Sequence, residues 1–246
     1  MSRLEIRVVT GRTVARETSD APVVVLLVDG VEVLEGRGNG FGPETLLHKG
    51  DPLLPAEPPR RVGLYKCGCG DAGCGITGCL ISESDGVVRW SGFRAFVGRY
   101  GPLDPALEDH VDSQPIDRED LVFDAAEYRA EVARAKADRT WETRRHRLGR
   151  LLKGRLEHQK RWDELSFEFV SVWVWGDDAD VFAVNLNRKG VERGQLVVGV
   201  RAPKGLDDDA MLDAVAAKVL AGDERSWFVI YDQERPSLAA RPEDVP

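Results

Sequence analysis

Four cysteines gather in one short, glycine-rich stretch, which is the part of this chain best suited to chemistry. They are Cys67, Cys69, Cys74 and Cys79, with the spacing C-x-C-x4-C-x4-C. Four thiolates at tetrahedral corners are a donor set that zinc prefers. Five glycines lie between them, and these allow the backbone to fold tightly around a small centre and to direct N–H groups toward sulfur. The spacing therefore predicts a structural metal site, with zinc as the cofactor.

Two other interpretations of the cysteines stay open, because zinc sites usually contain C-x-x-C pairs and this stretch has none. The cysteines can be free thiols packed in a glycine-rich turn. They can also serve a redox sensor or an enzyme that uses the thiolate of Cys67 or Cys69, which requires a lowered thiol pKa and access. Asp71 is the other ligand candidate nearby, and its setting favours a turn residue.

A basic segment is the second candidate site. Residues 139–161 contain nine Lys or Arg and two Glu, a net of +7, which leaves −15 for the rest of a chain whose total is −8. Leucines at helical spacing predict a helix from Trp141 to about Leu156 with one basic face. The residues that we expect to contact a partner are Arg144, Arg145, Arg147 and Arg150. Such a face suits an acidic protein partner or, less readily, a nucleic acid. Charge runs on helices are usually solvated faces, and here the acidic segments at 102–127 and Asp207–Asp209 can balance the charge.

The cysteines must be positioned by strands. The stretch Leu4–Val8 alternates apolar and polar residues, and Val23–Val28 is a continuous apolar run. Asp-Gly pairs at Asp29-Gly30 and Asp85-Gly86 predict two-residue hairpin turns, the second joining strands near Gly78–Glu83 and Val87–Trp90. The first half of the chain is therefore predicted to be β-rich.

The second half predicts helices and strands together. Asp124 resembles a helix N-cap, with Tyr128, Val132 and Ala135 on one face of the helix that follows. Further along, Leu165–Trp175 alternates with aromatic residues, which predicts a strand that packs its tryptophans in a core. Strands are also expected at 181–186, 196–201 and 227–231, with a helix between the last two that begins near residue 207 and ends at Gly222.

These elements predict an α+β fold. It has a β-rich N-terminal half with Asp-Gly hairpins, a central basic helix and a C-terminal β-β-β-α-β unit. The expected organisation is a cysteine-bearing half at 1–123, a bridging helix region at 124–162, an α+β half at 163–235 and a disordered tail at 236–246.

Composition limits the protein's class. The chain has 246 residues, of which 42% are hydrophobic, which excludes a mostly disordered chain. Net acidity disfavours a general DNA-coating protein. The longest apolar run is far shorter than a membrane span, and charges interrupt the N-terminal apolar stretch, so we expect a cytoplasmic location.

The stretch from Leu64 to Gly70, with Gly73-Cys74 and then Val88-Arg89-Trp90 and Phe93, resembles a hairpin in a family of uncharacterised bacterial proteins. The resemblance covers residues 22–156 and implies no activity. The sequence thus predicts a non-enzymatic, partner-binding protein with a structural metal- or thiol-bearing hairpin. The alternatives are a thiol-based redox sensor or enzyme and, more weakly, a nucleic-acid-binding protein.

Overall fold

The computed structural model describes residues 1–10, 12–14, 17–19, 21–34, 38–70, 72–108, 113–175, 181–191, 194–222 and 227–233. The chain forms two compact units, Met1–Trp141 and Glu142–Pro246. The boundary lies inside the stretch 124–162, where the sequence predicts a bridging helix region. The tail expected at 236–246 lies outside the described residues.

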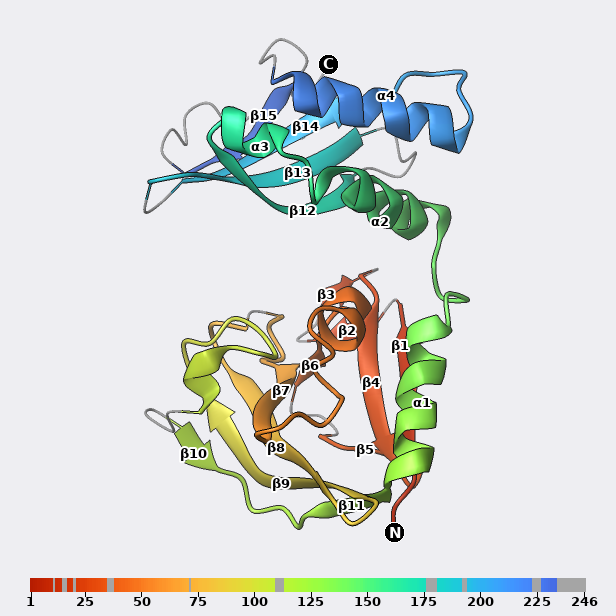
Figure 1. Cartoon of the computed structure of the whole chain (residues 1–246), viewed down its shortest axis with the longest axis vertical. Helices are drawn as coiled ribbons and strands as arrows, with labels where there is room; N and C mark the ends of the chain where they lie inside the picture. Colours follow the sequence, from red (N-terminus) through yellow and green to blue (C-terminus); the bar gives the residue numbers. More distant parts are fainter. Residues whose placement is uncertain are drawn as a thin grey trace. The chain divides into compact units, whose positions relative to one another are not determined.

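The first unit is built from antiparallel strands and carries one long helix (Figure 1). One sheet has the order β1-β4-β5, and a larger one has the order β10-β9-β8-β7-β6, with β11 also paired to β9. A separate pair is formed by β2 and β3. The bounds are β1 Leu4–Val9, β2 Arg12–Val14, β3 Glu17–Ser19, β4 Val23–Val28, β5 Val31–Glu32, β6 Asn39–Gly40, β7 Arg60–Lys66, β8 Ile76–Ser84, β9 Val87–Phe96, β10 Ser113–Pro115 and β11 Leu121–Asp124.

Both predicted Asp-Gly turns are confirmed. Val28 pairs with Val31 across the first turn, and the ends of β8 and β9 meet across the second. Asp29, Gly30, Asp85 and Gly86 all have positive φ, which is the conformation that a two-residue hairpin turn requires. The second turn joins β8 to β9, and β8 begins at Ile76, directly after the loop that carries Cys67, Cys69 and Cys74.

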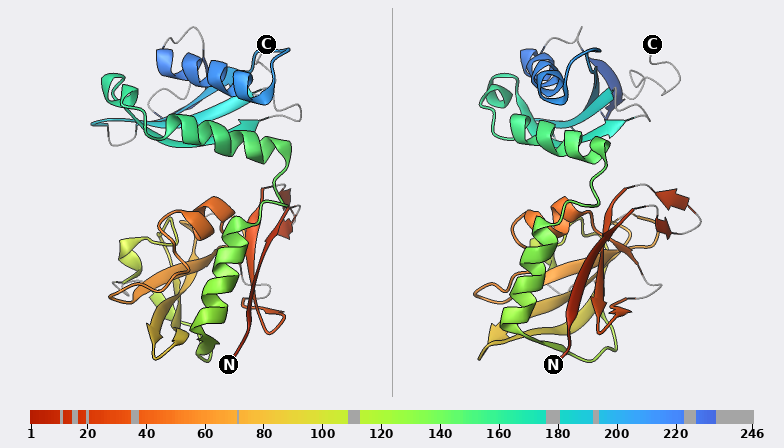
Figure 2. Two further views of the ribbon diagram at one scale, coloured as in Figure 1. Left: turned by 45° about the vertical axis from the view of Figure 1, so that its right-hand side comes forward. Right: turned by 90° about the vertical axis from the view of Figure 1, so that its right-hand side faces the viewer.

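Helix α1, Ala125–Ala137, covers the core of the first unit and runs beside β1 (Figure 2). The Asp124 carboxylate accepts hydrogen bonds from the N–H groups of Ala126 and Glu127, as expected of an N-cap. Tyr128, Val132 and Ala135 are buried, which confirms the predicted inner face. Two short helical turns, η1 Glu44–His48 and η2 Pro105–Leu107, complete this unit.

The second unit is an antiparallel sheet of order β12-β13-β14-β15. Helices pack on the face that presents Phe182, Val184 and Leu186. The bounds are α2 Arg144–Leu156, α3 Arg161–Glu164, β12 Phe167–Trp175, β13 Val181–Arg188, β14 Gln195–Arg201, α4 Asp208–Ala221 and β15 Phe228–Asp232. From β12 onward the order is β-β-β-α-β, which confirms the predicted C-terminal unit.

Two details of the second half differ from the sequence prediction. Helix α2 begins at Arg144, with Thr143 as its N-cap, so Trp141 precedes it and its indole N–H instead donates to the Asp138 carbonyl. In β12 the register shifts between Phe169 and Ser171, and Trp173 is 41% exposed instead of buried. A bulge adds one residue to a strand and so sends the following side chains to the opposite face.

Candidate metal centre

The cysteine-rich loop connects β7 to β8. Its ends are held together where the Cys67 N–H donates to the Gly75 carbonyl at 2.7 Å, directly beyond the paired residues Lys66 and Ile76. Within the loop, the Gly70 N–H donates to the Cys67 carbonyl at 2.9 Å. Gly70 has φ of +87°, a value that favours glycine. The glycines thus let the chain turn back sharply, as the sequence predicts.

Three of the four cysteines come together in this loop. The sulfur atoms of Cys67, Cys69 and Cys74 all lie within 4.8 Å of one another. A tetrahedral zinc ion with Zn–S bonds of about 2.3 Å separates its sulfurs by roughly 3.8 Å. The loop therefore needs only a small contraction to place three thiolates around one metal ion.

The three thiols are also hydrogen-bonded to one another. The pKa of Cys67 is lowered, first by a hydrogen bond from the Cys69 backbone N–H and then by the thiols of Cys74 and Cys69. The pKa of Cys74 is raised to about 11, because its thiol is hydrogen-bonded to Cys67 and Cys69. The cluster therefore stabilises negative charge on the Cys67 sulfur, and a bound cation would displace the thiol protons.

Cys79 lies apart from this cluster. It sits within β8 opposite Val62, is fully buried, and belongs to the hydrophobic core of the first unit. Burial raises the pKa of its thiol, and Arg61 and Arg118 offset this only in part. A signal for this placement is present in the sequence, because the strand expected at Gly78–Glu83 contains Cys79. Asp71 lies outside the described residues.

The predicted basic residues of α2 are largely paired with acidic side chains of their own unit. Arg144 and Arg147 both bond to Asp208 in the first turn of α4, at 2.6 and 3.0 Å. Arg150 bonds to Glu142 at 2.7 Å. Among the described residues no ion pair involves Arg145, which is partly exposed. Most of the positive charge at these four positions is thus balanced locally, and a role in partner binding stays a prediction.

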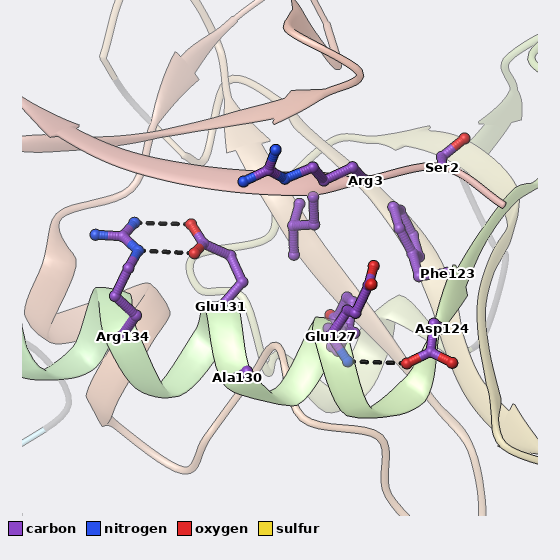
Figure 3. Close-up of a pocket in the computed structure, with 10 residues that line it drawn as sticks. Ser2, Arg3, Phe123, Asp124, Glu127, Ala130, Glu131 and Arg134 are labelled. Carbon is purple, nitrogen blue, oxygen red and sulfur yellow. Dashed lines mark hydrogen bonds and ion pairs between the residues drawn. The ribbon is translucent and has the colours of Figure 1, made fainter.

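A separate pocket of about 560 Å³ lies between β1 and α1 (Figure 3). The Glu131 carboxylate accepts the Ile6 N–H at 2.6 Å, and Arg134 donates to the Ile6 carbonyl at 2.7 Å. The two side chains also bond to each other, as the dashed lines in Figure 3 show. Helix α1 therefore hydrogen-bonds the free edge of β1. Sequence reasoning missed this pair, whose only local signal is the i, i+3 spacing of opposite charges.

Comparisons with protein-family models, with curated proteins and with solved structures gave no match. In the part of the chain that the structure describes, every helix is too short or too polar to cross a membrane.

Proposed function

We propose that this protein binds a thiophilic metal ion through Cys67, Cys69 and Cys74, with zinc as the first candidate. The observation that carries the proposal is the convergence of three sulfur atoms within 4.8 Å on one closed loop. Thiolates are soft ligands that favour zinc and copper(I) over magnesium or calcium. In this proposal the metal fixes the shape of the β7–β8 loop at the surface, where Cys69 and Cys74 are exposed to partners.

Three thiolates leave zinc one ligand short of the four that it usually takes. No further His, Cys, Asp or Glu joins the three cysteines within the described ranges. A water molecule or a side chain from a partner would then complete the coordination. This arrangement supports a protein that docks through its metal loop, without assigning it a reaction.

Metal analysis of the full-length protein tests the proposal. The protein is purified under reducing conditions without chelators, and its metal content is measured by mass spectrometry. We expect about one zinc ion per chain, with loss of the ion in Cys67→Ser, Cys69→Ser and Cys74→Ser. Chelation should also lower the melting temperature of the first unit, since metal binding is coupled to folding.

Cys79→Ala is the matched control for these variants. It removes a thiol that lies in β8, within the core and apart from the loop cluster, so it should reduce stability and leave the metal content unchanged. The proposal is overturned if the wild-type protein remains metal-free in excess zinc and its three loop thiols react freely with an alkylating reagent. It is also overturned if Cys79→Ala loses the metal while remaining folded.

A thiol-redox function is the second candidate, favoured by the approach of three sulfur atoms to within 4.8 Å of one another and by the lowered pKa of Cys67. Peroxide would oxidise two loop thiols to a disulfide, with both protons and both electrons passing to the peroxide to give two water molecules. Peptide mapping after mild peroxide treatment tests this reaction. We expect a bond between two of Cys67, Cys69 and Cys74; oxidation restricted to sulfinic or sulfonic acids would exclude it.

A further inference from the structure

The cysteine loop offers a complete donor set to an ion that takes three ligands. Zinc lacks one ligand there, but trivalent arsenic forms three bonds and carries a lone pair in place of a fourth ligand. We propose that Cys67, Cys69 and Cys74 bind trivalent arsenic, supplied as arsenous acid, as a tris-thiolate complex. This inference rests on the three-thiolate site of the proposed function and adds the ligand class that the site suits best.

The first support is the arrangement of the donors. The three sulfurs lie within 4.8 Å of one another, and the described part of the chain adds no fourth ligating side chain to them. A pyramidal ion binds with all three sulfurs on one side and its lone pair on the other. The cluster therefore matches this shape without help from water or from a partner.

The second support is access. Cys69 and Cys74 are exposed, and Cys67 is partly exposed, so a small neutral acid can reach all three sulfurs from solvent. The loop is also held in place before any ligand arrives, by the hydrogen bond from Cys67 to Gly75 and by another from the Gly98 N–H to the Gly73 carbonyl. A preorganised loop loses little conformational entropy on binding.

The chemistry balances without an oxidant or a reductant. Arsenous acid has three As–OH bonds. Each is replaced by an As–S bond, and each hydroxyl group leaves as water with the proton of one thiol. Three thiols and one arsenous acid thus give one tris-thiolate complex and three water molecules, and arsenic stays trivalent throughout.

The fourth cysteine provides an internal comparison. Cys79 is fully buried and lies apart from the other three cysteines, so its sulfur can neither bind the same arsenic atom nor be reached by arsenous acid from solvent. Arsenic uptake should therefore depend on exactly the three loop cysteines and be indifferent to Cys79. This pattern distinguishes a built tris-thiolate site from the binding of arsenic by any accessible pair of thiols.

The test uses the reduced, full-length protein titrated with sodium arsenite. Native mass spectrometry should show one arsenic gained and three hydrogens lost per chain, together with thiolate-to-arsenic absorption in the near ultraviolet. Arsenite should also release zinc from the zinc-loaded protein in a 1:1 ratio, as measured with a chromophoric chelator. Each of the Cys67→Ser, Cys69→Ser and Cys74→Ser variants should lose the stable complex, and Cys79→Ala should keep it.

Folding failure of a variant does not block the test. Protection of Cys79 from alkylation reports whether the first unit is folded in each loop variant, because this thiol is buried in its core. In the wild-type protein, reversible methylthiolation of the exposed thiols should abolish arsenic uptake, and reduction should restore it.

The outcomes separate this inference from the proposed function. If zinc binds but arsenite neither binds nor displaces it, the arsenic inference fails and the metal function stands. If neither binds, both fail. The inference also fails if any one loop cysteine can be replaced without loss of the complex, because arsenic is then held by two thiols only.

Discussion

Replacing Tyr128 with Phe should strongly destabilise the first unit. The Tyr128 hydroxyl accepts a hydrogen bond from the Trp90 indole N–H at 3.1 Å and donates one to the Leu53 carbonyl at 2.6 Å. All three residues are buried. Burial also raises the pKa of Tyr128, so the hydroxyl keeps its proton and remains a donor. This single oxygen therefore links α1, β9 and the loop after η1.

The expected loss follows from the groups left behind. Phe fills nearly the same volume, so the change creates little cavity and leaves two buried polar groups without their partner. A buried donor or acceptor left unsatisfied costs about 1–3 kcal/mol. A carbonyl tolerates this better than an N–H, so we expect a total of about 3 kcal/mol. With an m-value of roughly 1.5–2 kcal/mol/M in urea, the midpoint should fall by about 1.5–2 M.

The assay must report on the first unit alone. Cys79 serves this purpose, because its thiol is fully buried in the same core as Tyr128. Short pulses of alkylating reagent at increasing urea, followed by quantification of the Cys79 peptide, give the unfolding curve of this unit. Tyr100→Phe is the matched control: Tyr100 is 76% exposed, so loss of its hydroxyl should leave the midpoint unchanged.

A midpoint for Tyr128→Phe that matches the Tyr100→Phe control would refute the reasoning. It would mean that water or a rearranged side chain satisfies Trp90 and Leu53 in the variant. The hydroxyl would then be replaceable, and the three elements would be held together by apolar packing alone.

Three further predictions concern charge and backbone. Burial by itself would raise the pKa of Glu131, but the hydrogen bonds from Arg134 and the Ile6 N–H lower this pKa overall. The ionised carboxylate therefore stabilises the fold at pH values above its unfolded pKa, and this stabilisation is lost as the pH falls through the folded pKa. Glu131→Gln should weaken the loss of stability in thermal melts between about pH 5 and 3. Gly199→Ala should destabilise the second unit by about 1–3 kcal/mol in thermal melts, because a Cβ there would lie 2.2 Å from the Phe228 ring. Gly154→Ala in α2 meets nothing within 4 Å and should raise stability in the same assay by roughly 0.5–1 kcal/mol.

Local signals predicted most of the elements. Asp29-Gly30 and Asp85-Gly86 need only their own backbone preferences to turn the chain, and both form the expected turns. Helix α4 begins after residue 207 and ends at Gly222, as predicted from neighbouring residues alone; the structure adds that Asp207 is its N-cap and that Gly222 is left-handed. Such features depend on a few consecutive residues, which is why a single sequence contains them.

Features that depend on distant residues escaped prediction. The bulge after Phe169 depends on how β12 pairs with β13, and strict alternation without it would place Trp173 in the core. The spacing of the cysteines alone groups Cys79 with the other three. The expected strand at Gly78–Glu83 hints at its separation, but its burial depends on β7 and β9, which pair with that strand from both sides. The sequence did offer Asp207–Asp209 as a counter-charge for the basic face of α2, but it could not say which arginines pair with Asp208, because they lie more than 60 positions away.

The contacts of α1 with β1 also bear on how this protein behaves at high concentration. An edge strand with free N–H and C=O groups can recruit a strand from another chain and so begin aggregation. At Ile6 both groups are already bonded to Glu131 and Arg134. One carboxylate and one guanidinium on a helix thus occupy the hydrogen-bonding positions of Ile6 that an incoming strand would need, and they oppose intermolecular β-pairing at this point of the edge.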